Sequence, residues 1–177
     1  MSKIFKKHNS GFTIVEMLVS SLVFSIIAIS ISNVFIQIIN IQRRGIAFQK
    51  IQDNALFVTE SMSRDIRVSS VIDQESPGCV LTTLTMTHPI KGQVVYRVSG
   101  GIVEKSEGGG IFNPISTSDV NFTTMNFCVI GSVANDNQTP RIAILTSVQN
   151  KTGKETFHVN LQTSVSSRSL RDELQFP

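Results

Sequence analysis

The N-terminal fold of this chain is decided by residues 11–24, which read GFTIVEMLVSSLVF. They open an apolar run that continues to Ile41, and Glu16 is the single ionisable side chain between Phe12 and Ile41. As a helix rising about 1.5 Å per residue, residues 12–39 would span roughly 40 Å, which exceeds the ~30 Å hydrocarbon core of a bilayer. The stretch therefore predicts one transmembrane helix.

Two other interpretations of the apolar run fit less well. A cleaved secretory signal has an apolar core of about 7–15 residues followed by a small-residue cleavage site, whereas this run is longer and leads into NIQRRGIAFQK. A buried helix that is apolar all round needs more surrounding core than the rest of the chain offers. Lys3, Lys6 and Lys7 precede the run, which predicts a cytoplasmic N-terminus and an extracytoplasmic C-terminal domain.

The distribution of charge argues against general nucleic-acid binding. The 177-residue chain has a formal net charge of +3, from 16 Lys and Arg against 13 Asp and Glu. Three lysines lie in the first eleven residues, so the rest of the chain is balanced and lacks a concentrated positive face. A single tyrosine and no tryptophan argue equally against a broad aromatic binding surface.

A second apolar pattern follows the membrane segment. Its members recur every three or four residues, as on one face of an amphipathic helix: Phe48, Ile51, Ala55, Val58, Met62 and Ile66. No proline occurs before Pro77, so we predict one helix from near Phe12 to about Ser70. Glu60 and Arg64 should form an i,i+4 pair on its polar side.

The C-terminal part of the chain is predicted to be β-rich. Ser76-Pro77-Gly78 marks the end of the helical region, and β-prone runs then alternate with turn signals. The expected strands are 80–87, 93–98, 102–105, 119–130, 141–149 and 155–165. We predict an α+β fold in which the long N-terminal helix packs through its apolar stripe on an antiparallel sheet of about four to six strands.

Residues 6–18 resemble the N-terminal region of a known family. They read KKHNSGFTIVEML, in which a basic leader, Gly11, Phe12, three residues and Glu16 precede an apolar helix. This order resembles the class III leader of type IV pilins and type II secretion pseudopilins. The resemblance implies a pilin-like fold and a prepilin peptidase that cleaves between Gly11 and Phe12 and methylates the new amine of Phe12.

The resemblance and the periodicity together divide the chain into four segments. Residues 1–11 form the cleaved basic leader, and residues 12–41 form the transmembrane and assembly helix. Residues 42–75 form the amphipathic continuation of the helix, and residues 76–177 form the globular β-sheet domain.

Glu16 has a physical purpose in this scheme. A lone carboxylate in a low-dielectric region is costly, and so is the lone amine that cleavage creates on Phe12. Phe12 and Glu16 are four residues apart and share a helix face, and Glu16 can also meet the Phe12 amine of a neighbouring subunit. We expect Phe12 and Glu16 to form the assembly contact; the alternative is that Glu16 lies at headgroup depth and contributes little.

Two later segments suggest a subtype. The ending QTSVSSR at 162–168 and the segment ESMSRDIR at 60–67 are similar to J-type minor pseudopilins and larger minor pilins. This implies a structural subunit, not an enzyme, that leaves the plasma (inner) membrane to enter a type IV pilus or a type II secretion pseudopilus. The implied partners are other pilin or pseudopilin subunits, the prepilin peptidase, a membrane assembly platform and the lipid bilayer.

The alternative function is that of a minor pilin in a DNA-uptake pilus, with a globular domain that binds DNA. The balanced charge of the mature chain does not favour nucleic acid as a partner. A local patch formed by Arg141, Lys151 and Lys154 would support it. DNA binding that falls steeply with salt would be its signature.

Cys79 and Cys128 are the only cysteines, and their spacing leaves two interpretations open. Outside the membrane they can form a disulfide that closes a loop of about 50 residues. They can also be two separate thiols that pack as small apolar residues.

No metal or cofactor is expected. His8, His88 and His158 are scattered through the leader, a turn and a strand, and the cysteines lack the paired spacing of a zinc site. Residues 135–139, NDNQT, offer the alternating oxygen donors of a calcium loop but lack the glycine and the distant glutamate of an EF-hand. We expect an ordinary polar turn there.

Overall fold

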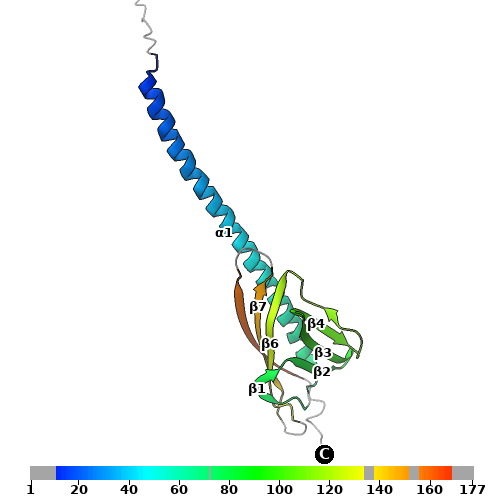
Figure 1. Cartoon of the computed structure of the whole chain (residues 1–177). Helices are drawn as coiled ribbons and strands as arrows, with labels where there is room; N and C mark the ends of the chain where they lie inside the picture. The colour runs from blue at the N-terminus through cyan, green and yellow to red at the C-terminus, as the bar shows by residue number, and fades with distance from the viewer. Residues whose placement is uncertain (1–10, 72, 134–137, 152–155, 169–177) are drawn as a thin grey trace, which may run out of the picture. The chain divides into compact units, whose positions relative to one another are not determined.

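The computed structural model describes residues 11–71, 73–133, 138–151 and 156–168. The chain divides into two compact units, Met1–Arg44 and Gly45–Pro177, and each is described by itself. The helix α1, Ile14–Val68, contributes its first part to one unit and its second part to the other (Figure 1).

The ends of α1 lie close to the predicted ones and have local causes. Thr13 caps the N-terminus, because its hydroxyl accepts a hydrogen bond from the Glu16 amide at 3.2 Å. At the other end, the Ser69 amide tightens the last turn by bonding to the Ile66 carbonyl at 3.3 Å. Ser70 then pairs with Thr87 as a β-bridge, so the chain leaves the helix two residues earlier than predicted.

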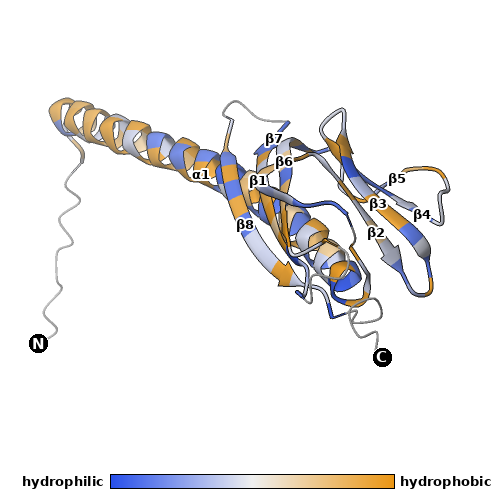
Figure 2. Cartoon of the chain, turned by 90° about the horizontal axis from the view of Figure 1, so that it is seen from below, coloured by the Kyte–Doolittle hydropathy of each residue, from blue (hydrophilic) through white to orange (hydrophobic). Residues whose placement is uncertain are grey.

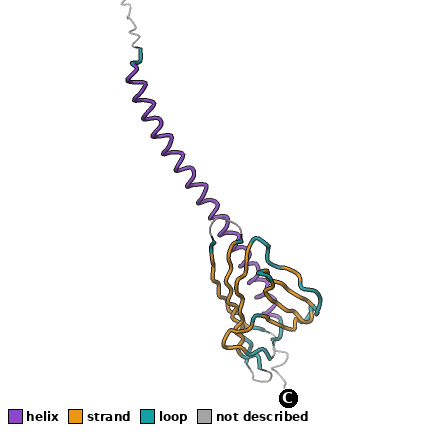
Figure 3. The backbone as a smooth tube through the Cα atoms, in the orientation of Figure 1, coloured by secondary structure: helices purple, strands orange, loops and turns teal. Residues whose placement is uncertain are grey.

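In the described residues of the second unit, eight strands follow α1. They are β1 (Ser76–Leu81), β2 (Thr83–His88), β3 (Gly92–Ser99), β4 (Ile102–Glu107), β5 (Asn113–Pro114), β6 (Val120–Ile130), β7 (Arg141–Asn150) and β8 (His158–Ser166). They form two four-stranded sheets, one in the order β1-β6-β7-β8 and one in the order β2-β3-β4-β5. Each of these pairings is antiparallel. Figure 3 shows the strands beside the second part of the helix.

Both sheets turn their apolar rows toward the second part of α1. Five positions of the predicted stripe are fully buried: Ile51, Ala55, Val58, Met62 and Ile66. They share one core with inner-row residues of both sheets, such as Tyr96 of β3 and Phe127 of β6. Figure 2 shows the two sheets on either side of this part of the helix. The predicted α+β, pilin-like arrangement of a long helix packed on antiparallel strands is confirmed.

The structure differs from the prediction in the number of sheets. The run 80–87 was expected as one strand, but it divides at Thr82: Leu81 ends β1 on β6, and Thr83 begins β2 on β3. The chain therefore crosses from one sheet to the other at this residue. The prediction that Phe48 belongs to the buried stripe is wrong, because its side chain is 44% exposed.

Candidate functional site

The predicted processing site lies immediately before the helix. Gly11 and Phe12 precede α1 and are exposed, Phe12 to 74%, so the bond between them is not covered by any described part of the chain. Glu16 is an exposed acid in the first turn of α1. Among the residues that the structure describes, no ion pair involves Glu16. The leader residues Lys3, Lys6, Lys7 and His8 lie outside the described residues.

The first part of α1 is long and apolar enough to cross a membrane. It includes an 18-residue apolar window of which none is buried. Four of its serine hydroxyls bond back to carbonyls of their own helix, including Ser25 to Ser21 and Ser32 to Ala28, both at 2.8 Å. Each hydroxyl is thereby satisfied without water, as a lipid environment demands. The helix continues through the segment at 30–34, which has no proline.

Comparison with known families agrees with this geometry. Residues 6–32 match the family model described as the prokaryotic N-terminal methylation motif. The chain carries a class III prepilin leader. Such a leader is typical of type IV pilins and pseudopilins, which are structural subunits, and it implies processing by a prepilin peptidase and assembly into a pilus-type filament. No curated protein and no solved structure matches the chain.

A buried cluster of charges surrounds Asp65 and was not predicted from the sequence. Asp65 lies on α1 with only 8% of its side chain exposed. Its carboxylate meets the Lys105 ammonium at 2.6 Å and the Lys91 ammonium at 3.1 Å, and it accepts a hydrogen bond from the Tyr96 hydroxyl at 2.6 Å. Glu107 pairs with the same two lysines, at 2.5 Å and 3.2 Å. The cluster therefore joins α1 to β3, β4 and the turn between β2 and β3.

The pKa shifts in the cluster follow from burial and hydrogen bonding. Burial alone would raise the pKa of the Asp65 carboxyl, but hydrogen bonds from Lys105, Tyr96 and Lys91 outweigh it and hold the pKa below its usual value. Burial would likewise lower the pKa of the Lys105 ammonium, and its bonds to Asp65 and Glu107 raise it instead. Burial and the bond to Asp65 both raise the pKa of the Tyr96 hydroxyl. These shifts favour fixed ion pairs and a neutral tyrosine, which is the pattern of a structural network.

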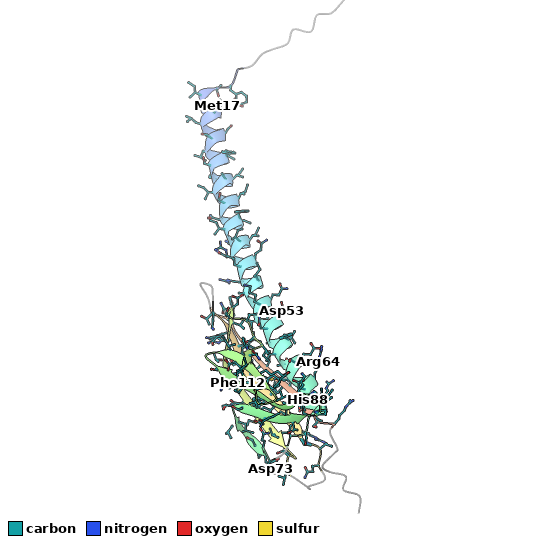
Figure 4. The ribbon with its side chains drawn as sticks, turned by 90° about the vertical axis from the view of Figure 1, so that its right-hand side faces the viewer. Met17, Asp53, Arg64, Asp73, His88 and Phe112 are labelled. Carbon is teal, nitrogen blue, oxygen red and sulfur yellow. A yellow bond between two sulfur atoms is a disulfide. The ribbon has the colours of Figure 1, made fainter. Side chains whose placement is uncertain are left out.

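His88 lies at the edge of this cluster, with its Nε2 4.0 Å from the Asp65 carboxylate. Its Nδ1 accepts hydrogen bonds from the Ile90 and Lys91 amides at 3.1 and 3.2 Å, which fixes the β2–β3 turn. Figure 4 labels His88 and, on α1, Arg64, whose predicted pairing with Glu60 is present at 2.5 Å. His158 starts β8 in the other sheet. Within the described residues, no three His, Cys, Asp or Glu side chains are grouped so that they could hold a metal ion.

The two cysteines are joined by a disulfide in the structure. The bond connects Cys79 in β1 to Cys128 in β6, 49 residues apart in sequence. Cys79 has a φ of +57°, and the pairing register shifts between Ser76 and Leu81. The disulfide therefore ties an irregular edge strand to the neighbouring strand β6.

Two of the three basic residues considered for DNA binding, Arg141 and Lys151, lie at opposite ends of β7. Arg141 begins β7, and Lys151 follows its last residue. At about 3.3 Å per residue, the two lie roughly 30 Å apart. Lys154 and most of the polar segment at 135–139 lie outside the described residues.

Proposed function

We propose that this protein is a minor pilin or pseudopilin. After removal of residues 1–11, residues 12–41 would hold it in the plasma membrane and then in a filament, and residues 42–75 and 76–177 would form the extracytoplasmic part. The resemblance of its helix end and its last strand to J-type minor pseudopilins favours a minor subunit. The observation that carries the proposal is a Gly11–Phe12 junction exposed directly before a helix that presents apolar side chains on all faces.

The exposed apolar helix needs a solvent other than water. Most of its large side chains from Ile14 to Ile41 are roughly half to four-fifths exposed, and no described segment buries its apolar window. Lipid is the first such solvent, and the helices of neighbouring subunits are the second. A structural subunit that moves from the membrane into a filament is surrounded first by lipid and then by the helices of its neighbours.

Glu16 favours the transfer of the subunit from the membrane into the filament. The carboxylate has no cation among the described residues, and burying it without one is costly. The amine freed on Phe12 by cleavage supplies the missing charge, within one chain or from a neighbour. Glu16 and Phe12 therefore act together as the assembly contact.

Two measurements test the proposal. Mass spectrometry of the protein from cells should find a mature chain that begins at methylated Phe12. Glu16→Ala should leave this cleavage intact and reduce recruitment into filaments, because the Phe12 amine loses its partner. Glu60→Ala is the matched control, since it removes another exposed acid of the same helix, whose ion pair with Arg64 is open to solvent. An intact N-terminus at Met1, or normal recruitment of Glu16→Ala, would contradict the proposal.

A further inference from the structure

Three carboxamide side chains lie in the apolar first part of α1. They are Asn33, Gln37 and Asn40, and all three are exposed. The hydroxyl of the nearby Ser30 is bonded to its own helix, at the Ile26 carbonyl 2.9 Å away. No hydrogen bond joins the three carboxamides to another residue in the part of the chain that the structure describes. Each keeps two N–H donors and a carbonyl acceptor for a partner, and leaving such groups unbonded in lipid is costly.

The three carboxamides belong to one seam that runs along the helix. They follow one another at spacings of four and three residues, and the same alternation extends back to Glu16. The members of this seam are Glu16, Val19, Val23, Ile26, Ser30, Asn33, Gln37 and Asn40. Such an alternation over about three heptads is the pattern by which two helices pack side by side in a left-handed coiled coil. A second helix would pack on the apolar half of the seam and bond to its carboxamide half.

A second copy of the chain matches the seam by its chemistry. A carboxamide both donates and accepts hydrogen bonds, so an identical carboxamide is a complementary partner. Two copies anchored in one membrane in the same direction present Asn33, Gln37 and Asn40 at the same heights, so in a parallel pair each meets its own counterpart. Asn and Gln side chains bond across membrane helices in this way, and an Asn in the seam fixes the register of a two-stranded coiled coil.

The charges at the two ends of the seam define its length. Glu16 of each copy would lie beside its counterpart, and the Phe12 amines freed by cleavage, four residues earlier on the same seam, would neutralise both carboxylates. Beyond Asn40 the next position of the repeat is Arg44, where a second copy would bring like charges together. The pairing therefore ends between Asn40 and Arg44.

We propose that the first part of α1 joins two copies of this chain, in parallel and in register, along the seam from Glu16 to Asn40. The three carboxamides bond to their counterparts, and the apolar members of the seam pack between the two helices. The inference rests on the proposed function for the membrane anchorage and the common direction of the copies, and it adds a homodimer in the membrane.

The first test is sedimentation equilibrium of the full chain purified in detergent. The unchanged chain should show a monomer–dimer equilibrium. Asn33→Leu combined with Gln37→Leu should weaken the dimer about tenfold, because it removes hydrogen bonds between the helices and leaves the apolar contacts. Ser32→Leu is the matched control. It introduces the same residue next to Asn33 but off the seam, where the Ser32 hydroxyl bonds only to its own helix, and should leave the dimerisation constant unchanged.

The second test is disulfide cross-linking in the membrane of the host. The two native cysteines are bonded to each other, so a single introduced cysteine reports on its own neighbour. On oxidation, Val23→Cys, which lies on the seam, should give a disulfide-linked dimer. Ala28→Cys, which lies five residues later on the opposite face of the helix, should give none. Adding Asn33→Leu and Gln37→Leu to Val23→Cys should reduce the cross-linked dimer.

The controls separate this proposal from the proposed function. The near-UV signal of the buried Tyr96 shows whether each variant keeps a folded domain, and cleavage at Gly11–Phe12 is followed by mass spectrometry in the same cells. A chain that is monomeric at all concentrations would overturn the pairing. So would a dimer that is insensitive to the two carboxamide substitutions, or equal cross-linking through Val23→Cys and Ala28→Cys. Any of these results with a cleaved leader counts against the pairing alone, and an uncleaved leader counts against the proposed function alone.

Discussion

The buried carboxylate of Asp65 supports a quantitative prediction. Asp65→Asn keeps the shape of the side chain but removes the charge that faces two lysines. Lys105 has only 11% of its side chain exposed, so it cannot reach water freely, and Glu107 remains as its only acid in the described cluster. Removing one partner of a buried pair costs about 3–5 kcal/mol. Because Glu107 stays in place and Lys91 is 34% exposed, we expect about 3 kcal/mol.

Tyr96 gives this prediction a direct assay. It is the single tyrosine of a chain without tryptophan, it is fully buried, and it bonds to Asp65. Near-UV circular dichroism near 280 nm therefore reports largely on this site. In thermal unfolding of the full chain in detergent, Asp65→Asn should lower Tm by about 10 °C. Asp53→Asn, an exposed acid of the same helix, should change Tm little.

The pH dependence of the free energy of unfolding provides a second test of the stabilising role of Asp65. The pKa of Asp65 is lowered in the folded state, so its stabilisation is present above about pH 4, the ordinary value for Asp, and is lost as the pH falls through the folded value. Asp65→Asn should therefore unfold with a shallower dependence on pH below about 4. A free energy of unfolding within about 0.5 kcal/mol of the unchanged protein would refute the assigned role.

Two further predictions concern the strands. Replacing Cys79 and Cys128 together by serine should destabilise the domain by about 4 kcal/mol, because the bond closes a loop of 49 residues, and a reduced sample should melt like the variant. Gly101→Ala should cost more than Gly100→Ala in chemical unfolding. Both residues have positive φ, but only a Cβ at Gly101 would meet the Asn121 side chain, at 1.7 Å, whereas none lies within 4 Å at Gly100. Equal costs would show that Asn121 moves aside freely.

Periodicity predicted the elements well wherever burial is set by one local face. The stripe from Ile51 to Ile66 is buried as predicted, and β6 and β7 lie within one residue of the predicted ranges. Phe48 continues the same spacing but lies at the beginning of the domain's core, where the sheets no longer cover it. The spacing identifies the apolar face of a helix, but it does not show at which residue the sheets stop covering that face.

The features that were missed depend on partners distant in sequence. The run at 80–87 is uniformly β-prone, so nothing local marks Thr82 as the crossing between two sheets. The sequence did indicate that Asp65 lies on the buried face of the helix, because it comes three residues after Met62 and one before Ile66. Its partners Lys91 and Lys105 come from β-sheet segments whose packing on α1 could not be derived from spacing.

Glu16 and Asp65 pose the same physical problem on one helix and solve it differently. Each is an acid beside apolar residues of the same helix, Val15 and Met17 for Glu16 and Met62 and Ile66 for Asp65. Asp65 is neutralised within its own domain by Lys105, Lys91 and the Tyr96 hydroxyl. For Glu16 the described part of the chain supplies no cation, so its counter-charge has to come from outside that part. The acid that is satisfied internally stabilises the fold, and we propose that the other is satisfied through processing and assembly.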